Sequence, residues 1–144
     1  MHFARQRLPG AFMSKELFWL SWTLAVTALF AFPYVLNRIF VRGVWGTLRN
    51  PSNSDVVLAP WAERAQRAQA NATENLVVFA PAVIVISLLN LGNTTTVFTC
   101  QLYFYSRLVH YVAYSAGIPV LRTLAYFGGW AGIAMLVYRL LSVA

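Results

Sequence analysis

Long apolar runs alternate with short polar segments along the chain. The first run, residues 17–37, contains no charged residue and exceeds the roughly 20 residues that span about 30 Å of hydrocarbon. Pro33, near its far end, is expected to kink or end the helix. Residues 38–59 are rich in glycine, arginine and turn formers, so this segment is predicted to be a loop.

A second helix is predicted over residues 60–91, with a polar first half, an apolar second half from about residue 75, and a kink at Pro81. At 1.5 Å per residue it would be about 45 Å long and would project beyond the bilayer. An uncharged turn at 90–96 precedes further spans at 97–116 and 120–143, which are separated by Gly117, Ile118 and Pro119. The pattern predicts one domain, residues 1–144, folded as an all-α, up-down-up-down four-helix transmembrane bundle.

The composition supports a membrane protein. Hydrophobic residues make up 59% of the 144 residues and charged residues only 10%, against about 25% charged residues in soluble domains. A soluble enzyme is therefore excluded, and the single cysteine, Cys100, excludes a disulfide scaffold. The net charge of +7 lies in short segments between apolar runs, so membrane lipid, not nucleic acid, is the expected partner.

The distribution of basic residues predicts an orientation. Cytoplasmic loops carry an excess of lysine and arginine. The segments after the first and third spans hold Arg38, Arg42, Arg49, Arg64, Arg67 and Arg122. The opposite side holds Arg5, Arg7, Lys15 and Arg139. We therefore expect the first group in the cytoplasm, with Arg5 and Arg7 near anionic lipid. Within the last span, Gly128 and Gly132 have the small-xxx-small spacing of close helix packing.

Polar residues recur on one face of each later helix. At about 100° per residue, the polar residues of each helix fall within an arc of about 80° or less. These stripes are Glu63, Arg67, Asn71 and Glu74 in the second helix; Tyr103, Arg107, His110 and Tyr114 in the third; and Arg122 and Tyr126, with Thr123 beside them, in the fourth. Lipid does not tolerate such side chains, so they are expected to converge in the bundle or between subunits.

The converging groups are several guanidinium groups, a carboxylate, an amide and hydroxyls. Arginine binds carboxylates bidentately, and Glu74 offers a partner for an ammonium group. The set therefore suits a small, zwitterionic ligand with several carboxylates. No cysteine and histidine residues occur at metal-ligand spacing, so we expect no metal. A solvated first helical turn with i,i+4 pairs remains an equally plausible explanation for Glu63.

Two motifs resemble those of the MAPEG family, the membrane-associated proteins of eicosanoid and glutathione metabolism. Residues 63–75, ERAQRAQANATEN, match the form E-R-x-x-R-A-x-x-N-x-x-E. Residues 107–126, which include RLVHYVAY, GIP and RTLAY, look like the third and fourth helices of the microsomal prostaglandin E synthase branch and its bacterial relatives. The resemblance implies a homotrimer of four-helix subunits, with glutathione sites between neighbouring subunits that open toward the cytoplasm. The compact loops and the lack of an organelle signal favour a bacterial inner membrane.

By position, the resemblance assigns roles to ten residues. It implies that glutathione is bound by Arg42, Arg67, Asn71, Glu74, Arg107, His110 and Tyr114. It implies that Arg122, Tyr126 and Thr123 act at the thiol. Two positions depart from the synthase: Ala70 stands in place of a ligand-binding arginine, and Thr123 in place of a serine.

The implied activity is a glutathione-dependent transferase or peroxidase. An arginine beside the sulfur would favour the thiolate, the nucleophilic form, for attack on a lipophilic electrophile or a lipid hydroperoxide that arrives through the bilayer. A non-catalytic lipid- and glutathione-binding protein of the same family is the alternative. A small transporter is a third class, but four spans give little room for a pore, and no inverted repeat is visible.

Overall fold

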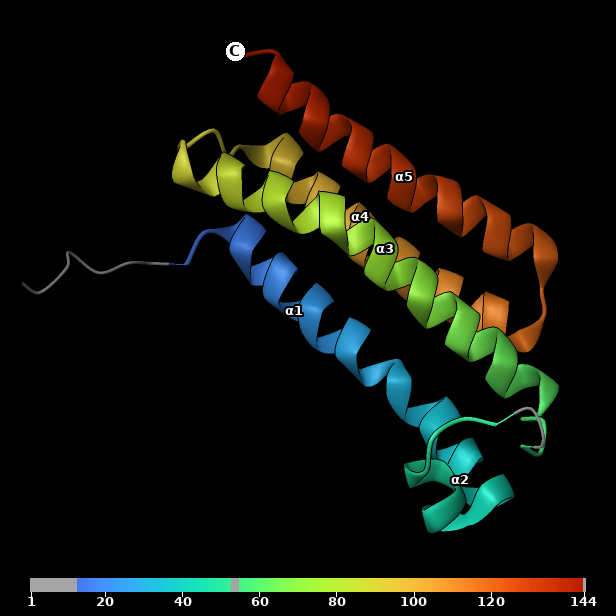
Figure 1. The fold of residues 1–144 in the computed structure, drawn as a ribbon. Helices are drawn as coiled ribbons and strands as arrows, with labels where there is room; N and C mark the ends of the chain where they lie inside the picture. The colour runs from blue at the N-terminus through green and yellow to red at the C-terminus, as the bar shows by residue number, and fades with distance from the viewer. Residues whose placement is uncertain (1–12, 53–54, 144) are drawn as a thin grey trace, which may run out of the picture.

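The computed structural model describes residues 13–52 and 55–143, and every regular element in these ranges is an α-helix (Figure 1). The helices are α1 (Lys15–Leu29), α2 (Ala31–Leu48), α3 (Pro60–Leu88), α4 (Thr94–Ala116) and α5 (Pro119–Leu141). Arg5 and Arg7 lie outside the described residues.

The first helical rod is longer than its sequence pattern predicts. The predicted loop from residue 38 is wrong as far as Leu48, because these residues belong to α2, which follows α1 and then turns away from its direction at a kink (Figure 1). Pro33 does not end the helix; the break lies one turn earlier, at Phe30. The reason is local, because proline has no N–H to donate to the carbonyl four residues before it and its ring crowds that carbonyl. A second kink occurs inside α2 at Gly43, whose φ of 71° favours glycine.

The other helix boundaries follow from capping residues. Pro60 and Pro119 occupy the first turns of α3 and α5, where a missing N–H costs nothing. Asn93 and Thr96 form a reciprocal capping box, so α4 begins at Thr94, three residues before its predicted start. Gly117 ends α4 with a φ of 80°. The predicted break before the last helix is therefore confirmed, and α3 continues through Pro81 to Leu88.

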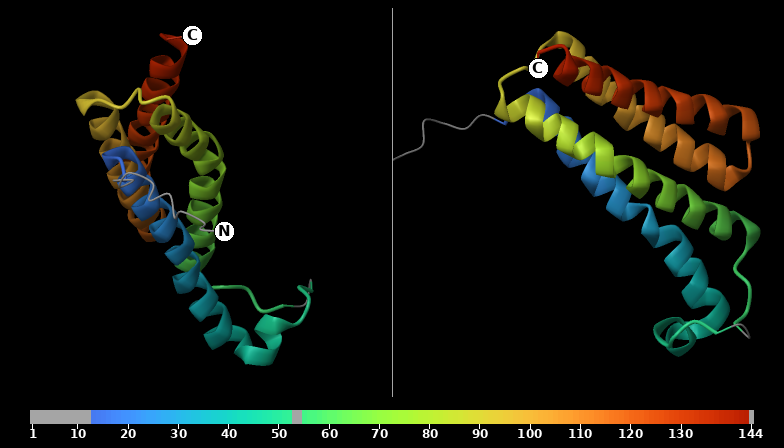
Figure 2. Two further views of the ribbon diagram at one scale, coloured as in Figure 1. Left: turned by 90° about the vertical axis from the view of Figure 1, so that its left-hand side faces the viewer. Right: turned by 45° about the horizontal axis from the view of Figure 1, so that its top comes forward.

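Consecutive helical rods run in alternating directions, with α4 packed against α1, α3 and α5 (Figures 1 and 2). The core is built from aliphatic and aromatic side chains in the half of the bundle where α1 begins. Its buried members include Leu20, Val83, Ile86, Ile133 and Leu136. At its centre the rings of Phe79 and Tyr103 stack 3.7 Å apart.

Three of the described helical stretches are long and apolar enough to cross a membrane: Lys15–Leu48, Pro60–Leu88 and Pro119–Leu141. The chain is an integral membrane protein on this evidence and on its composition. α4 is not among the three, since it carries Arg107, His110 and several hydroxyl side chains. α4 as the fourth membrane span therefore remains a prediction. Its polar groups are mostly buried inside the bundle.

Glycines allow α5 to pack closely on α4, as their spacing predicts. A Cβ atom on Gly132 would lie 3.3 Å from the Tyr103 Cβ, and one on Gly128 would lie 2.6 Å from the Ser106 hydroxyl. The tightest position is Gly129, where an added Cβ would lie 2.0 Å from an Arg107 nitrogen. The backbone of α5 therefore lies directly against the Arg107 guanidinium.

Gly129→Ala should consequently destabilise the bundle. Over-packing of this kind costs about 1–3 kcal/mol, so the midpoint of thermal unfolding in detergent should fall. The cause is tested by a double-mutant cycle with Arg107→Met, whose unbranched side chain can vacate the space. The penalty for Gly129→Ala should shrink in the Arg107→Met background. An equal penalty in both backgrounds would show that the guanidinium is not what the added methyl meets.

Candidate functional site

The Arg107 guanidinium joins three helices at the inner surface of α4. Its Nη1 donates a hydrogen bond to the Asn71 side-chain oxygen on α3 at 3.1 Å, and its Nη2 donates to the Tyr126 carbonyl on α5 at 3.2 Å. Only 2% of Arg107 is exposed. Three of the stripe residues predicted to converge therefore meet in one place.

This buried cation has no carboxylate partner among the described residues, whose two ion pairs both involve Asp55. Its compensation is weaker: the rings of Tyr103 and Tyr126 lie 5.2 and 5.7 Å from its central carbon. Its Nε and the neighbouring Tyr103 hydroxyl are buried without a hydrogen-bond partner. A buried charged group with so little compensation is costly, and at membrane depth such groups usually belong to functional sites.

Aromatic contacts extend the site toward the α4–α5 turn. The buried His110 ring lies 5.5 Å from the Tyr114 ring and 6.2 Å from the Tyr126 ring. The Arg122 guanidinium lies over the Tyr114 ring at 4.7 Å. We call the set Asn71, Arg107, His110, Tyr114, Arg122 and Tyr126 the arginine–aromatic cluster. It unites six of the ten site residues expected from the sequence.

A second group of predicted residues lies apart from the cluster, between α2 and α3. Residues of α2, α3 and the connection between them line a pocket of about 610 Å³. A separate pocket of about 430 Å³ lies at the other end of the bundle. The polar lining of the larger pocket includes Arg38, Arg42, Asp55, Glu63, Gln66 and Arg67, and Ala70 also borders it. We call it the α2–α3 pocket. Arg42 and Arg67 therefore line the same pocket; their role in binding glutathione stays a prediction.

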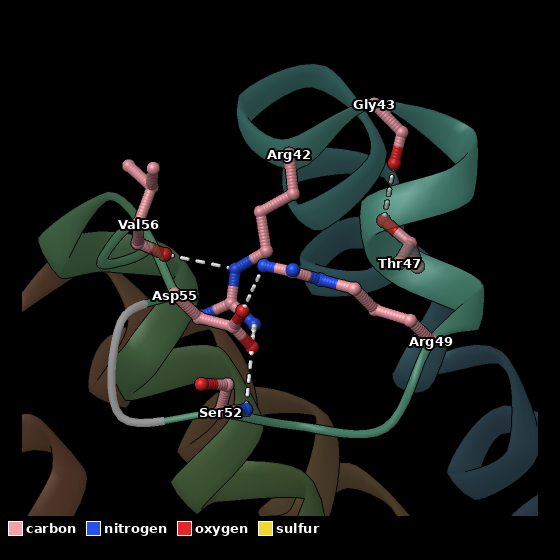
Figure 3. Close-up of polar contacts among 7 residues, drawn as sticks. All are labelled: Arg42, Gly43, Thr47, Arg49, Ser52, Asp55 and Val56. Atoms are coloured by element: carbon pink, nitrogen blue, oxygen red, sulfur yellow. Dashed lines mark hydrogen bonds and ion pairs between the residues drawn. The ribbon is translucent and has the colours of Figure 1, made fainter.

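Asp55 holds Arg42 in that pocket (Figure 3). The Arg42 Nη1 lies 2.9 Å from one Asp55 carboxylate oxygen, and its Nε donates to the Val56 carbonyl at 2.8 Å. Arg49 pairs with the other carboxylate oxygen. The Ser52 N–H also donates to the Asp55 carboxylate at 3.1 Å. This arginine–aspartate clamp, made of Arg42, Arg49 and Asp55, fixes the segment between α2 and α3.

The clamp also sets the protonation behaviour of Asp55. The backbone hydrogen bond from Ser52 has the largest effect and lowers the pKa of Asp55. Burial, the second-largest effect, raises it, and the charges of Arg49 and Arg42 lower it again, so the pKa ends below its ordinary value. Asp55 had no role in the sequence prediction. The signal available was only an aspartate in a turn flanked by arginines, which does not reveal which arginine it binds.

Two predicted site residues remain outside both groups. Glu74 is exposed on α3, and Thr123 is exposed on α5. The Thr123 hydroxyl donates to the Pro119 carbonyl of its own helix at 2.9 Å. Arg67 is likewise exposed at the pocket edge. In the described part of one chain, no three histidine, cysteine or carboxylate side chains gather to hold a metal ion.

The fold and these groups define the class: a helical membrane protein with a buried basic cluster beside an arginine-lined pocket. A sequence model of the MAPEG family matches residues 16–142, nearly the whole chain. The chain therefore belongs to the MAPEG family, as the two motifs indicate, and this family includes glutathione transferases and peroxidases. No curated protein matches the chain.

Asp55→Asn should release the connection between α2 and α3. Removing the carboxylate charge breaks both arginine pairs, so backbone amides of residues 49–59 should exchange hydrogen faster in detergent at neutral pH. Glu63→Gln is the matched control, since Glu63 lines the same pocket but forms no ion pair with a described residue. Equal exchange in wild type and Asp55→Asn would show that the clamp does not hold the segment.

The lowered pKa of Asp55 predicts a pH dependence with a definite sign. A carboxyl group with a lower pKa in the folded than in the unfolded state stabilises the fold above its ordinary pKa of about 3.9. That contribution is lost as the pH falls through the lowered value. Below about pH 4, segment 49–59 should therefore loosen in the wild type, as followed by exchange corrected for intrinsic rates. In Asp55→Asn, exchange of segment 49–59 should already be fast at neutral pH and should not increase further as the pH falls below about 4.

Proposed function

We propose that this protein is a glutathione-dependent transferase or peroxidase of the membrane, with glutathione as cosubstrate. The observation that carries the proposal is the buried Arg107, which lacks a carboxylate and is surrounded by Asn71, His110 and tyrosines. Glutathione supplies two carboxylates, an ammonium group and a thiol. A site with uncompensated guanidinium groups gains most from such an anion, because each new pair relieves an existing desolvation penalty.

The binding roles follow from charge. Arg42, Arg67 and Arg107 offer guanidinium groups for the ligand carboxylates, and Glu74 offers a carboxylate for its ammonium group. Asn71, His110 and Tyr114 complete the polar wall around Arg107. Asp55 forms an ion pair with Arg42 in the structure. A ligand carboxylate must therefore compete with Asp55 for Arg42 or bind to the other side of the Arg42 guanidinium.

A homotrimer would bring the separate groups together. Arg67 and Glu74 are exposed on α3 in a single chain, and Glu74 directly precedes the apolar half of that helix. Lipid would not accommodate these charges unpaired. A neighbouring subunit that covers this face of α3 would shield them and would place one site at each of three subunit boundaries.

Arg122 is the proposed group at the sulfur. It lies over Tyr114, beside the cluster, and forms no ion pair with a described residue. A cysteine-type thiol has a pKa of about 8.5, and each unit by which a nearby cation lowers it corresponds to about 1.36 kcal/mol. The thiolate then forms a bond to an electrophilic carbon and displaces its leaving group, such as chloride; the thiol proton passes to solvent.

The same thiolate can serve as a reductant of a lipid hydroperoxide. Its sulfur attacks the terminal peroxide oxygen, the O–O bond breaks, and the lipid alkoxide takes a proton to leave as an alcohol. The glutathione sulfenic acid that remains is reduced by a second glutathione, which gives the disulfide and water. Both reactions need a water-soluble nucleophile and an apolar substrate supplied by the bilayer.

The arginine-rich end of the bundle is the proposed cytoplasmic end. Arg64 donates to the Ser115 carbonyl at 3.0 Å, which places the start of α3 beside the end of α4. The arginines of α2, early α3 and early α5 thus belong to one end, consistent with the excess of arginine on cytoplasmic sides. Glutathione is a cytoplasmic thiol, and a bacterial inner membrane is the proposed location.

A non-catalytic glutathione- or lipid-binding protein is the second candidate. Ala70 on the α2–α3 pocket supplies no guanidinium, and Arg42 is already paired. A protein of this kind would bind glutathione but show no turnover with any acceptor. Calorimetric binding measured beside turnover separates the two candidates.

Arg122→Ala should lower turnover more than binding. With a chlorinated dinitroaromatic acceptor, kcat/KM at neutral pH should fall about tenfold or more, because loss of one unit of thiol acidification is a factor of ten. The pH–rate profile should shift upward, with activity recovered in alkali, while glutathione binding by calorimetry changes less. Arg139→Ala, at the opposite end of the same helix, is the control. Equal rates for wild type and Arg122→Ala would remove Arg122 from the mechanism.

Tyr126→Phe and Thr123→Ala should differ. The Thr123 hydroxyl already donates a hydrogen bond to the Pro119 carbonyl. By contrast, no described group accepts a hydrogen bond from the Tyr126 hydroxyl, whose ring lies near His110. We therefore expect Tyr126 to donate to the thiolate, so Tyr126→Phe should lower kcat by about tenfold, the range for a hydrogen bond to a charged group. Thr123→Ala should cost less than twofold. A larger loss for Thr123→Ala than for Tyr126→Phe would reverse this assignment.

A further inference from the structure

The start of α1, the end of α3 and the start of α4 lie together at one end of the bundle (Figures 1 and 2). A polar pocket lies there, opposite the proposed glutathione site. Its volume is about 430 Å³. The lining residues are Ser14, Lys15, Glu16, Ser87, Asn90, Gly92, Asn93, Thr94 and Val97. None of them belongs to the arginine–aromatic cluster or to the α2–α3 pocket.

A buried carboxylate forms the base of this pocket. Glu16 is only 5% exposed, although it lies in the first turn of α1. One of its oxygens accepts a hydrogen bond from the Thr96 hydroxyl at 2.6 Å. A Cβ atom on Gly92 would lie 2.6 Å from that oxygen, so the α3–α4 turn passes close over the carboxylate. The chain therefore holds the group in position.

The carboxylate has no cationic partner among residues 13–52 and 55–143. Both ion pairs in these ranges involve Asp55 at the other end of the bundle. The second Glu16 oxygen accepts no hydrogen bond from this part of the chain. A buried carboxylate normally requires a cation or several donors, so the pocket is suited to a ligand with a positively charged, hydrogen-donating group.

The other polar lining indicates what accompanies that positive group. Lys15 brings an exposed ammonium to the pocket rim, and Ser14 and Ser87 form a hydroxyl pair at 3.1 Å. A carboxylate next to an ammonium is complementary to a zwitterion whose positive and negative groups are a few bonds apart. The volume is far larger than a bare metal ion requires and is sufficient for a small organic headgroup.

The pocket also lies where lipid headgroups are found. It is at the ends of helices long enough to span the bilayer, and large apolar side chains beside it, Leu88, Leu89 and Phe98, are exposed. Acyl chains can therefore follow the helix surfaces while the headgroup enters the pocket. A soluble zwitterion would gain nothing from these apolar surfaces.

We propose that this pocket binds the headgroup of a phosphoethanolamine lipid, with the ammonium on Glu16 and the phosphate on Lys15. The ammonium N–H groups donate to the free Glu16 oxygen, which a trimethylated choline headgroup cannot do. The site is independent of glutathione chemistry and makes the protein selective for the lipid at one membrane surface.

The test uses the full-length protein in detergent, titrated with phosphatidylethanolamine or phosphatidylcholine of the same acyl chains. Bound lipid is counted by native mass spectrometry, and stability is followed by thermal unfolding. Wild type should prefer phosphatidylethanolamine by about tenfold, the range for one charge-assisted hydrogen bond. Glu16→Gln should lose this preference, and Lys15→Gln should weaken binding of both lipids. Glu63→Gln, a carboxylate at the opposite end, should behave as wild type.

Three results would overturn the proposal: equal binding of the two lipids by wild type, a preference that survives in Glu16→Gln, or binding of soluble phosphoethanolamine as tight as that of the lipid. If Glu16→Gln fails to fold, the lipid comparison in wild type and the Lys15→Gln variant still decide. Glutathione turnover is measured in parallel, and its absence would leave the lipid preference unchanged, so the two proposals fail separately.

Discussion

The burial of the Arg107 guanidinium is the constraint on which the rest of the bundle depends. A cation placed among helices in a membrane must receive hydrogen bonds from its neighbours, and it receives them from Asn71 on α3 and from the Tyr126 carbonyl on α5. Those bonds fix the rotation of both helices about their axes. The glycine at 129 then follows, because any side chain there would occupy the guanidinium's own volume. One charged side chain thus determines the contacts of three helices.

This arrangement leaves the cation short of one interaction. The aromatic rings of Tyr103 and Tyr126 partly replace a counter-charge, but Nε remains unpaired. A protein selected for stability alone would gain by replacing the group with an apolar side chain of similar volume. The proposed function accounts for its presence by a ligand whose negative charge completes the site.

The sequence pattern predicts the helices well and their ends less well. Apolar length gives the long helices, and the proline and glycine signals give the α4–α5 break. It fails at residues 38–48, where glycine and arginine indicate a loop but helix continues with a kink at Gly43. Helical spacing correctly groups Asn71 with Arg107, because residues on one face of each helix must meet somewhere. It says nothing about Asp55 or Glu16, whose partners, Arg42 and Thr96, are set by the positions of chain segments 13 and 80 residues apart.

Helical spacing also overstates how much of a stripe one subunit can use. Arg67, Asn71 and Glu74 share a face of α3 within an arc of about 60°, yet only Asn71 reaches the cluster, while Arg67 and Glu74 are exposed. In a single chain this face is therefore divided: Asn71 contacts Arg107 on α4, and the side that carries Arg67 and Glu74 is exposed. Its two edges must therefore serve different partners: one the chain's own α4, the other whatever covers α3 from outside. Lipid does not accommodate an unpaired carboxylate and guanidinium on that outer edge, and this is why the proposed function assigns the edge to a neighbouring copy with the ligand between the two.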